Sequence, residues 1–132
     1  MARSYRNLVV WQRAMDLAEG VYGAARGFPK YEQYALCDQL RRAAVSVASN
    51  IAEGCGRGTD RDWAHFLGQA MGSLCEVETQ LELARRLGYI GQDVLDELTG
   101  TARETGKMLY ALIQKYGTGG QGNAAKAGGA GG

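Results

Sequence analysis

Residues 59–88 read TDRDWAHFLGQAMGSLCEVETQLELARRLG and carry the clearest helical pattern in the chain. Apolar residues recur in it every three or four positions, which is the spacing of one face of an α-helix. They are Trp63, Phe66, Leu67, Ala70, Leu74, Val77, Leu81 and Ala84. Thr59 is a good N-cap, Asp62 can complete a capping box, and Gly88 can cap the C-terminal end. The stretch therefore predicts one helix of about 40 Å.

Three more segments carry the same periodicity, and none alternates as a strand does. They run from about residue 9 to 26, from about 32 to 54 and from about 92 to 116. Gly27 and Pro29 end the first segment, and the run Gly54-Cys55-Gly56-Arg57-Gly58 reads as the turn that ends the second. Because every connection is only a few residues long, consecutive helices are expected to lie antiparallel as neighbours.

The predicted fold class is therefore all-α, an antiparallel up-and-down four-helix bundle over residues 1–116. Its expected core comes from one face of each helix. The first helix contributes Trp11, Ala14, Met15, Ala18, Val21, Tyr22 and Ala25; the second Leu36, Leu40, Ala43, Ala44, Val47 and Ile51; the last Val94, Leu95, Leu98, Ala102, Met108, Leu109, Leu112, Ile113 and Tyr116. Residues 117–132 form a Gly/Ala-rich tail that we expect to be disordered.

Charge and cysteine content narrow the class of protein. With 132 residues and a formal net charge of +1, the chain has the size of one domain and no global electrostatic case for nucleic-acid binding. The charge is uneven, since residues 1–61 carry nine Lys and Arg against six Asp and Glu, and residues 62–116 carry five against eight. Cys37, Cys55 and Cys75 form no CxxC pair, so free thiols in a reducing compartment are expected. The apolar run at residues 8–11 is too short for a signal sequence or membrane span, which favours a cytoplasmic location.

A second stripe of small residues runs down the second and third helices, on the side opposite each predicted core. These outer stripes consist of Val45, Ser49 and Ala52 on the second helix and Gly68, Gly72, Cys75 and Thr79 on the third. A glycine inside a helix costs about 1 kcal/mol relative to alanine, so the close approach of another backbone is the natural reason for two of them. The stripes thus predict an interface between copies of the chain, with drift on a solvated face as the alternative.

The sequence offers little support for a catalytic or metal-binding site. Di-metal sites in four-helix bundles need several Glu residues and Glu-x-x-His pairs, but the chain has one histidine, His65, which with Asp62 faces away from the core. No base stands near a nucleophile, and the 54–58 run follows a helix and lacks the lysine of a phosphate-binding loop. We therefore expect no enzymatic activity, no metal and no cofactor.

Charged residues suggest two local roles. Arg57 and Arg61 could bind a phosphate near the N-terminal end of the third helix, but ordinary solvated side chains are the simpler explanation. Arg41, Asn50 and Glu78 sit at the edges of the core faces and are expected to form a partly buried polar network between the second and third helices.

Several stretches closely resemble the four helix bundle protein family, also called the 23S rRNA intervening-sequence protein family. The matching stretches are residues 8–14, 28–30, 39–47, 49–54, 72–74, 76–81 and 87–89, in order and over nearly all of residues 8–116. Two positions depart from the family pattern, because many relatives have a proline where Ala48 stands and an aromatic residue where Cys55 stands.

The resemblance implies an up-and-down bundle that assembles into rings, with the homopentamer as the expected form. Some relatives are encoded inside rRNA genes, and the accessory protein of diversity-generating retroelements looks like a basic relative that binds nucleic acid and a reverse transcriptase. The leading hypothesis is thus an oligomeric scaffold that binds RNA, DNA or a nucleoprotein partner through Arg41, Arg42, Arg57 and Arg61. The alternative is a protein-only adaptor without nucleic-acid affinity, which the near-neutral charge favours.

Overall fold

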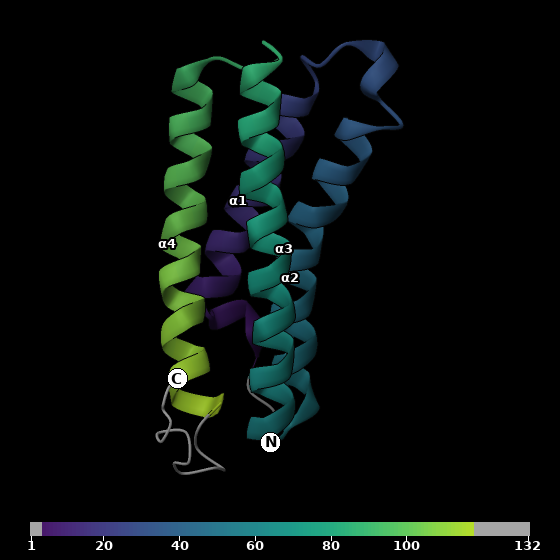
Figure 1. Ribbon diagram of the computed structural model, residues 1–132. Helices are drawn as coiled ribbons and strands as arrows, with labels where there is room; N and C mark the ends of the chain where they lie inside the picture. The colour runs from purple at the N-terminus through teal and green to yellow at the C-terminus, as the bar shows by residue number, and fades with distance from the viewer. Residues whose placement is uncertain (1–3, 118–132) are drawn as a thin grey trace, which may run out of the picture.

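Four antiparallel helices make up the described part of the chain (Figure 1). The structure is a computed structural model and describes residues 4–117. The helices are α1 (Val9–Ala25), α2 (Leu36–Arg57), α3 (Asp60–Arg86) and α4 (Gln92–Gly117), with short 3-10 turns at η1 (Tyr5–Asn7) and η2 (Lys30–Glu32). Residues 4–117 contain no strand. The predicted all-α up-and-down bundle is confirmed, while the predicted tail lies outside the described residues from 118 onward.

The helices are arranged as a square in which each packs against two others. Consecutive helices are neighbours, and α1 closes the square by packing against α4. The α1/α2 side of the bundle is therefore opposite the α3/α4 side. This arrangement leaves one outward-facing strip on every helix.

Both ends of α3 are capped as the sequence predicts. The Thr59 hydroxyl accepts a hydrogen bond from the Asp62 amide at 3.1 Å. At the other end Gly88 has a φ of 81°, where a side chain is disfavoured. The Gly88 amide donates to the Arg85 carbonyl at 2.9 Å and the Tyr89 amide to the Ala84 carbonyl at 2.8 Å, which is a Schellman motif.

The second helix begins later than predicted. The sequence placed its start near Glu32, but α2 begins at Leu36, and the preceding residues form η2 after Pro29. The Glu32 carboxylate accepts from the Leu36 amide at 3.2 Å, so this side chain caps the helix from outside instead of lying within it.

The predicted turn at residues 54–58 is also wrong, because α2 continues to Arg57 and only Gly58, with a φ of 92°, breaks it. Gly54 is a buried helix residue. A Cβ atom placed on it would lie 2.7 Å from the Phe66 Cβ and 2.9 Å from a ring carbon of Trp63. The glycine is needed because α3 passes too close for a side chain, not because the helix ends there.

The predicted core residues are largely correct for α2 and α3 and partly wrong for α1. All the predicted core residues of α2 are buried, as are those of α3 except the half-buried Phe66. On α1, Met15 and Tyr22 are 37% and 45% exposed, and Leu17 and Val10 are buried instead. The buried face of α1 is rotated towards α4, which lies so close that a Cβ atom on Gly20 would be 2.5 Å from a methyl carbon of Leu98.

The predicted network of Arg41, Asn50 and Glu78 does not form within the chain. Asn50 instead donates to the carbonyl and hydroxyl oxygens of Ser46, at 2.9 and 3.0 Å. The Ser46 hydroxyl is 2.7 Å from the hydroxyl of Ser73 on α3. This link fixes the register of the two helices, since Ser46 and Ser73 must lie at the same level of the bundle.

None of the helices within residues 4–117 combines the length and the apolar character needed to cross a bilayer.

Candidate interaction surfaces

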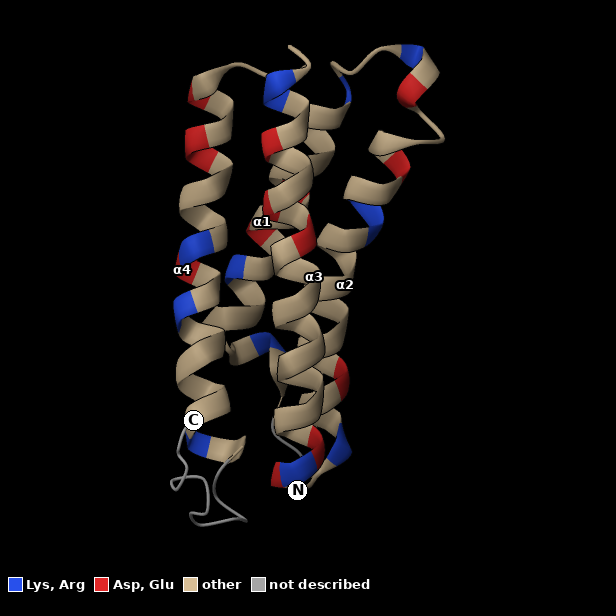
Figure 2. Cartoon of the chain, in the orientation of Figure 1, with Lys and Arg blue, Asp and Glu red and all other residues tan. Residues whose placement is uncertain are grey.

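The four arginines predicted to bind nucleic acid fall into two separate pairs (Figure 2). Arg41 and Arg42 lie in the first half of α2, whereas Arg57 ends that helix and Arg61 lies in the first turn of α3. At a rise of 1.5 Å per residue, Arg42 and Arg57 are about 22 Å apart along α2. A single copy thus offers two small basic sites instead of one basic patch.

Two of these arginines are paired with carboxylates of their own helix. The Nε of Arg42 lies 2.9 Å from an Asp38 oxygen, and the Nε of Arg57 lies 2.9 Å from a Glu53 oxygen. The guanidinium of Arg57 also lies 4.9 Å from the centre of the Phe66 ring, which orients it. Exposed ion pairs of this kind contribute little stability, so both arginines remain able to exchange partners.

Arg61 lines a hollow of about 530 Å³ together with Thr59, Asp62 and His65. The first turn of α3 carries two carboxylates, Asp60 and Asp62, which oppose a bound anion. The Thr59 hydroxyl already holds the Asp62 amide, so one of the free amides at this helix end is occupied. Any phosphate here must therefore be held by arginine side chains more than by the helix terminus.

The outer stripes are exposed, as predicted. Val45 is 42% exposed, Ala52 is half-buried, and Ser49, Gly68, Gly72, Cys75 and Thr79 are exposed. A Cβ atom placed on Gly68 or Gly72 would meet nothing within 4 Å. Nothing within residues 4–117 therefore explains why these two helix positions lack a side chain.

Apolar side chains line the junction of α1 and α2, where the rotated face of α1 leaves them in solvent. We call this surface the seam and define it by Met15, Tyr22 and Val45. The Arg41 guanidinium lies 5.9 Å from the centre of the Tyr22 ring, which places that face of α1 beside α2. Met15 lies two turns from Tyr22 and Val45 one turn from Arg41, so all three side chains line the same junction.

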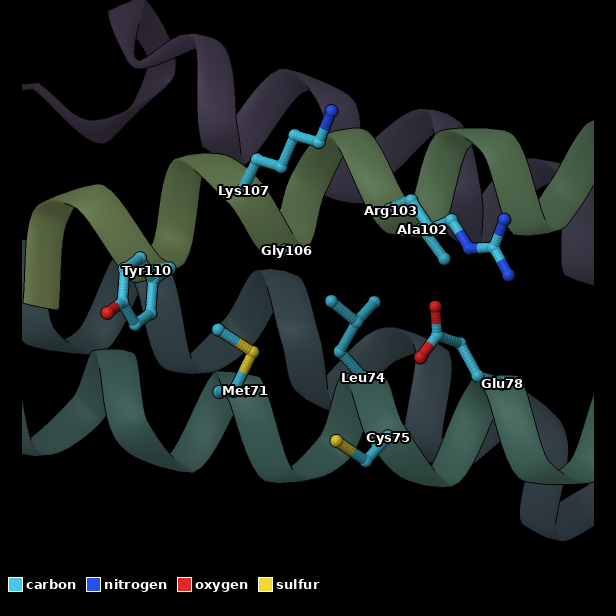
Figure 3. A pocket seen from close by; sticks show the side chains of 9 residues that line it. All are labelled: Met71, Leu74, Cys75, Glu78, Ala102, Arg103, Gly106, Lys107 and Tyr110. Carbon is cyan, nitrogen blue, oxygen red and sulfur yellow. The ribbon is translucent and has the colours of Figure 1, made fainter.

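On the opposite side of the bundle, α3 and α4 enclose a groove of about 420 Å³ (Figure 3). Its apolar residues are Met71, Leu74, Cys75, Ala102, Gly106 and Tyr110, and its charged rim consists of Glu78, Arg103 and Lys107. Gly106 lets the two helices approach, since its Cβ would lie 3.2 Å from a methyl carbon of Leu74. Tyr110 is 59% exposed on one wall, and Glu78 and Arg103 lie at the same end on opposite walls.

The described residues include no group of three or more His, Cys, Asp or Glu that could hold a metal ion. Cys37 and Cys55 are buried and Cys75 is exposed, and none of the three is part of a disulfide. The Cys37 thiol lies 3.5 Å from the Ala25 carbonyl, which it can use as a hydrogen-bond acceptor between α2 and α1.

The sequence did not predict one cluster of titratable side chains, which consists of Tyr31, Glu32 and Tyr89. The Tyr89 hydroxyl donates to Glu32 at 2.7 Å and lies 3.4 Å from the Tyr31 hydroxyl, which ties the α3–α4 connection to η2. The pKa of Tyr89 is raised by its hydrogen bonds to Tyr31 and Glu32, because both favour the neutral phenol. The rings of Tyr89 and Phe28 also pack together, tilted by 47° with their centres 5.2 Å apart, so the cluster holds the α3–α4 connection against the segment before α2.

The seam and the groove also escaped prediction. Met15 and Tyr22 were assigned to the core because they share the three-to-four spacing of the residues that are buried. The groove could not be predicted because its residues come from two helices. Its one sign in the sequence was Tyr110, a large side chain at the edge of an apolar face, which the structure leaves exposed.

These features define the class of the protein, which is an antiparallel four-helix bundle. The family model of the 23S rRNA-intervening sequence protein matches residues 6–111. The chain therefore belongs to the 23S rRNA-intervening sequence protein family.

A solved structure shares the fold. It is the crystal structure of a protein with unknown function from the S23 ribosomal protein family of Bacteroides thetaiotaomicron. The two superpose with a TM-score of 0.73 at 22% sequence identity, over 79% of this chain and 97% of that chain. At this identity the likeness supports the fold alone. A comparison with curated proteins finds no match.

Proposed function

We propose that the chain is a non-enzymatic cytoplasmic scaffold that assembles into a ring of identical copies, with the homopentamer as the expected form. In this proposal the ring binds RNA, DNA or a nucleoprotein partner such as a reverse transcriptase complex. The observation that carries the proposal is the pair of exposed glycines, Gly68 and Gly72, in the middle of α3.

The argument for assembly is energetic. Each helical glycine costs about 1 kcal/mol relative to alanine, and alanine would fit at both positions of the isolated chain. The cost is offset if another helix lies on this strip, because small residues allow close approach and dense dispersion contacts. The outer stripe of α2, which also consists of small residues, is a suitable partner in a second copy.

Nucleic-acid binding is the part of the proposal supported by Arg57 and Arg61. These two side chains lie at the same end of the bundle, and the Phe66 ring orients the guanidinium of Arg57. One copy has too few arginines for strong binding at a net charge of +1. A ring repeats the pair once per copy, which raises affinity through multivalency.

Light scattering and a binding titration test the two parts separately. The wild-type chain should have a mass several times 14.2 kDa. The assembled protein should bind duplex DNA or structured RNA, with an affinity that falls steeply with salt. The double variant Arg57→Glu, Arg61→Glu should lose this binding and keep its mass.

The matched control is Arg26→Glu with Arg86→Glu, which makes the same charge change at two other exposed arginines. Binding lost equally in both variants would show that only net charge matters. If neither RNA nor DNA binds the wild-type assembly, the protein-only adaptor replaces the nucleic-acid part. A wild-type mass of one chain would refute the assembly.

A further inference from the structure

The seam and the groove lie at the same level of the bundle. The Ser46–Ser73 contact places Val45, in the seam, level with Leu74, which lines the groove. Gly106 is level with Leu74 because the two are in contact range. The seam of one copy can therefore meet the groove of another when the two copies lie side by side, with no shift along the bundle axis.

A second copy moved sideways in this way would place its α1/α2 side against the α3/α4 side of the first. Its α2 would then lie on α3, and its α1 on α4. Both pairs are antiparallel, since α2 and α4 run opposite to α1 and α3 (Figure 1). The outer stripes of α2 and α3 would face each other across this contact. The α2 helix of the second copy would then pack on Gly68 and Gly72.

The charges on the two sides match in this arrangement. Arg41 is five residues before Ser46 and Glu78 five after Ser73, so in antiparallel helices they share one level. Arg41 of one copy would thus face Glu78 of the next.

The second pair of helices, α1 and α4, also carries charges of opposite sign. Gly20 on α1 is level with Leu98 of α4, because a Cβ atom on Gly20 would lie 2.5 Å from a methyl carbon of Leu98. Glu19 of the next copy would therefore lie about one turn from Arg103, which lines the groove on α4. Among residues 4–117, Glu19, Glu78, Arg103 and Lys107 take part in none of the ion pairs. Opposite charges would therefore share one level on the α2–α3 pair and lie within about one turn of each other on the α1–α4 pair.

We infer that the α1/α2 seam of one copy seats in the α3/α4 groove of the next, so that every copy uses one seam and one groove. The contact is heterologous, and its repetition closes a ring if the rotation between copies allows. The inference rests on the proposed self-assembly and names the surfaces that perform it. The tail is not the occupant, because residues 118–132 contain no large apolar side chain to fill the groove.

Two variants that each block one surface test the inference. Val45→Arg places a charged side chain on the seam, and Cys75→Arg places one on the exposed wall of the groove. Each variant alone should have the mass of one chain. An equal mixture should give a dimer of about twice 14.2 kDa and nothing larger, because one intact seam meets one intact groove and the two blocked surfaces repel.

Matched controls separate this effect from charge or misfolding. Val9→Arg alters an exposed valine outside the seam, and Ala111→Arg an exposed residue of α4 outside the groove; both should assemble as the wild type does. Circular dichroism should show helical proteins throughout. All samples need a reductant, since Cys75 is exposed.

The outcomes are distinguishable. A wild-type protein with the mass of one chain refutes the assembly itself. A wild-type oligomer whose blocked variants also assemble keeps the assembly and overturns the seam-in-groove contact. Single-chain variants that stay single in the mixture overturn it as well, because an intact seam and an intact groove are then both present and do not bind each other.

Discussion

Gly54 is the residue on which the spacing of α2 and α3 most directly depends. A Cβ atom there would lie 2.7 Å from the Phe66 Cβ and 2.9 Å from a Trp63 ring carbon. The Phe66 Cβ is attached to the backbone and cannot rotate away. Gly54→Ala therefore forces α2 and α3 apart or displaces the Trp63 ring, which is 3% exposed.

The expected cost follows from two opposing effects. Overpacking a well-packed core costs about 1–3 kcal/mol, and a fixed neighbour puts this site at about 2–3 kcal/mol. The higher helix propensity of alanine relative to glycine offsets about 1 kcal/mol of this cost. The free energy of unfolding should fall by about 1–2 kcal/mol, or about 4–8 °C in Tm.

Urea unfolding followed by circular dichroism measures this change. The matched control is Gly100→Ala on α4, where a Cβ atom meets nothing within 4 Å. That variant should gain about 1 kcal/mol from helix propensity alone. Both variants should be compared at the same protein concentration, since assembly would raise the stability of every sample. If Gly54→Ala proves as stable as Gly100→Ala, the helices separate without cost and close approach is not the reason for the glycine.

Two further substitutions test the caps and connections of the fold. Thr59→Ala should lower the free energy of unfolding by about 1 kcal/mol through loss of the α3 N-cap, and Thr59→Ser should restore most of it; equal stability of all three proteins in urea would contradict this. Tyr89→Phe should change the pH dependence of unfolding. The folded state raises the pKa of Tyr89 above its usual 10.0, so the stabilisation is complete below pH 10.0 and lost as the pH rises further. The wild type should thus lose stability more steeply than Tyr89→Phe in alkali, and parallel pH profiles would refute the role of the cluster.

The sequence alone determined the four helices and their antiparallel order. Periodicity and caps are local properties, and short connections leave few topologies. The core of α2 and α3 was predictable for the same reason, because these helices carry one clear apolar face. The sequence also showed the glycine pair on α3, although it did not show which surface packs on it.

The packing of the helices, and not the sequence pattern, selects which α1 residues are buried and explains the individual glycines. Met15, Leu17 and Tyr22 are all apolar, and the direction of α4 selects Leu17 for the core. Gly54 and Gly68 look alike in the sequence, yet a Cβ atom on Gly54 would collide with α3, whereas one on Gly68 would meet nothing within 4 Å. Burial and register depend on where a second helix lies, and that position is set by the packing of the whole bundle.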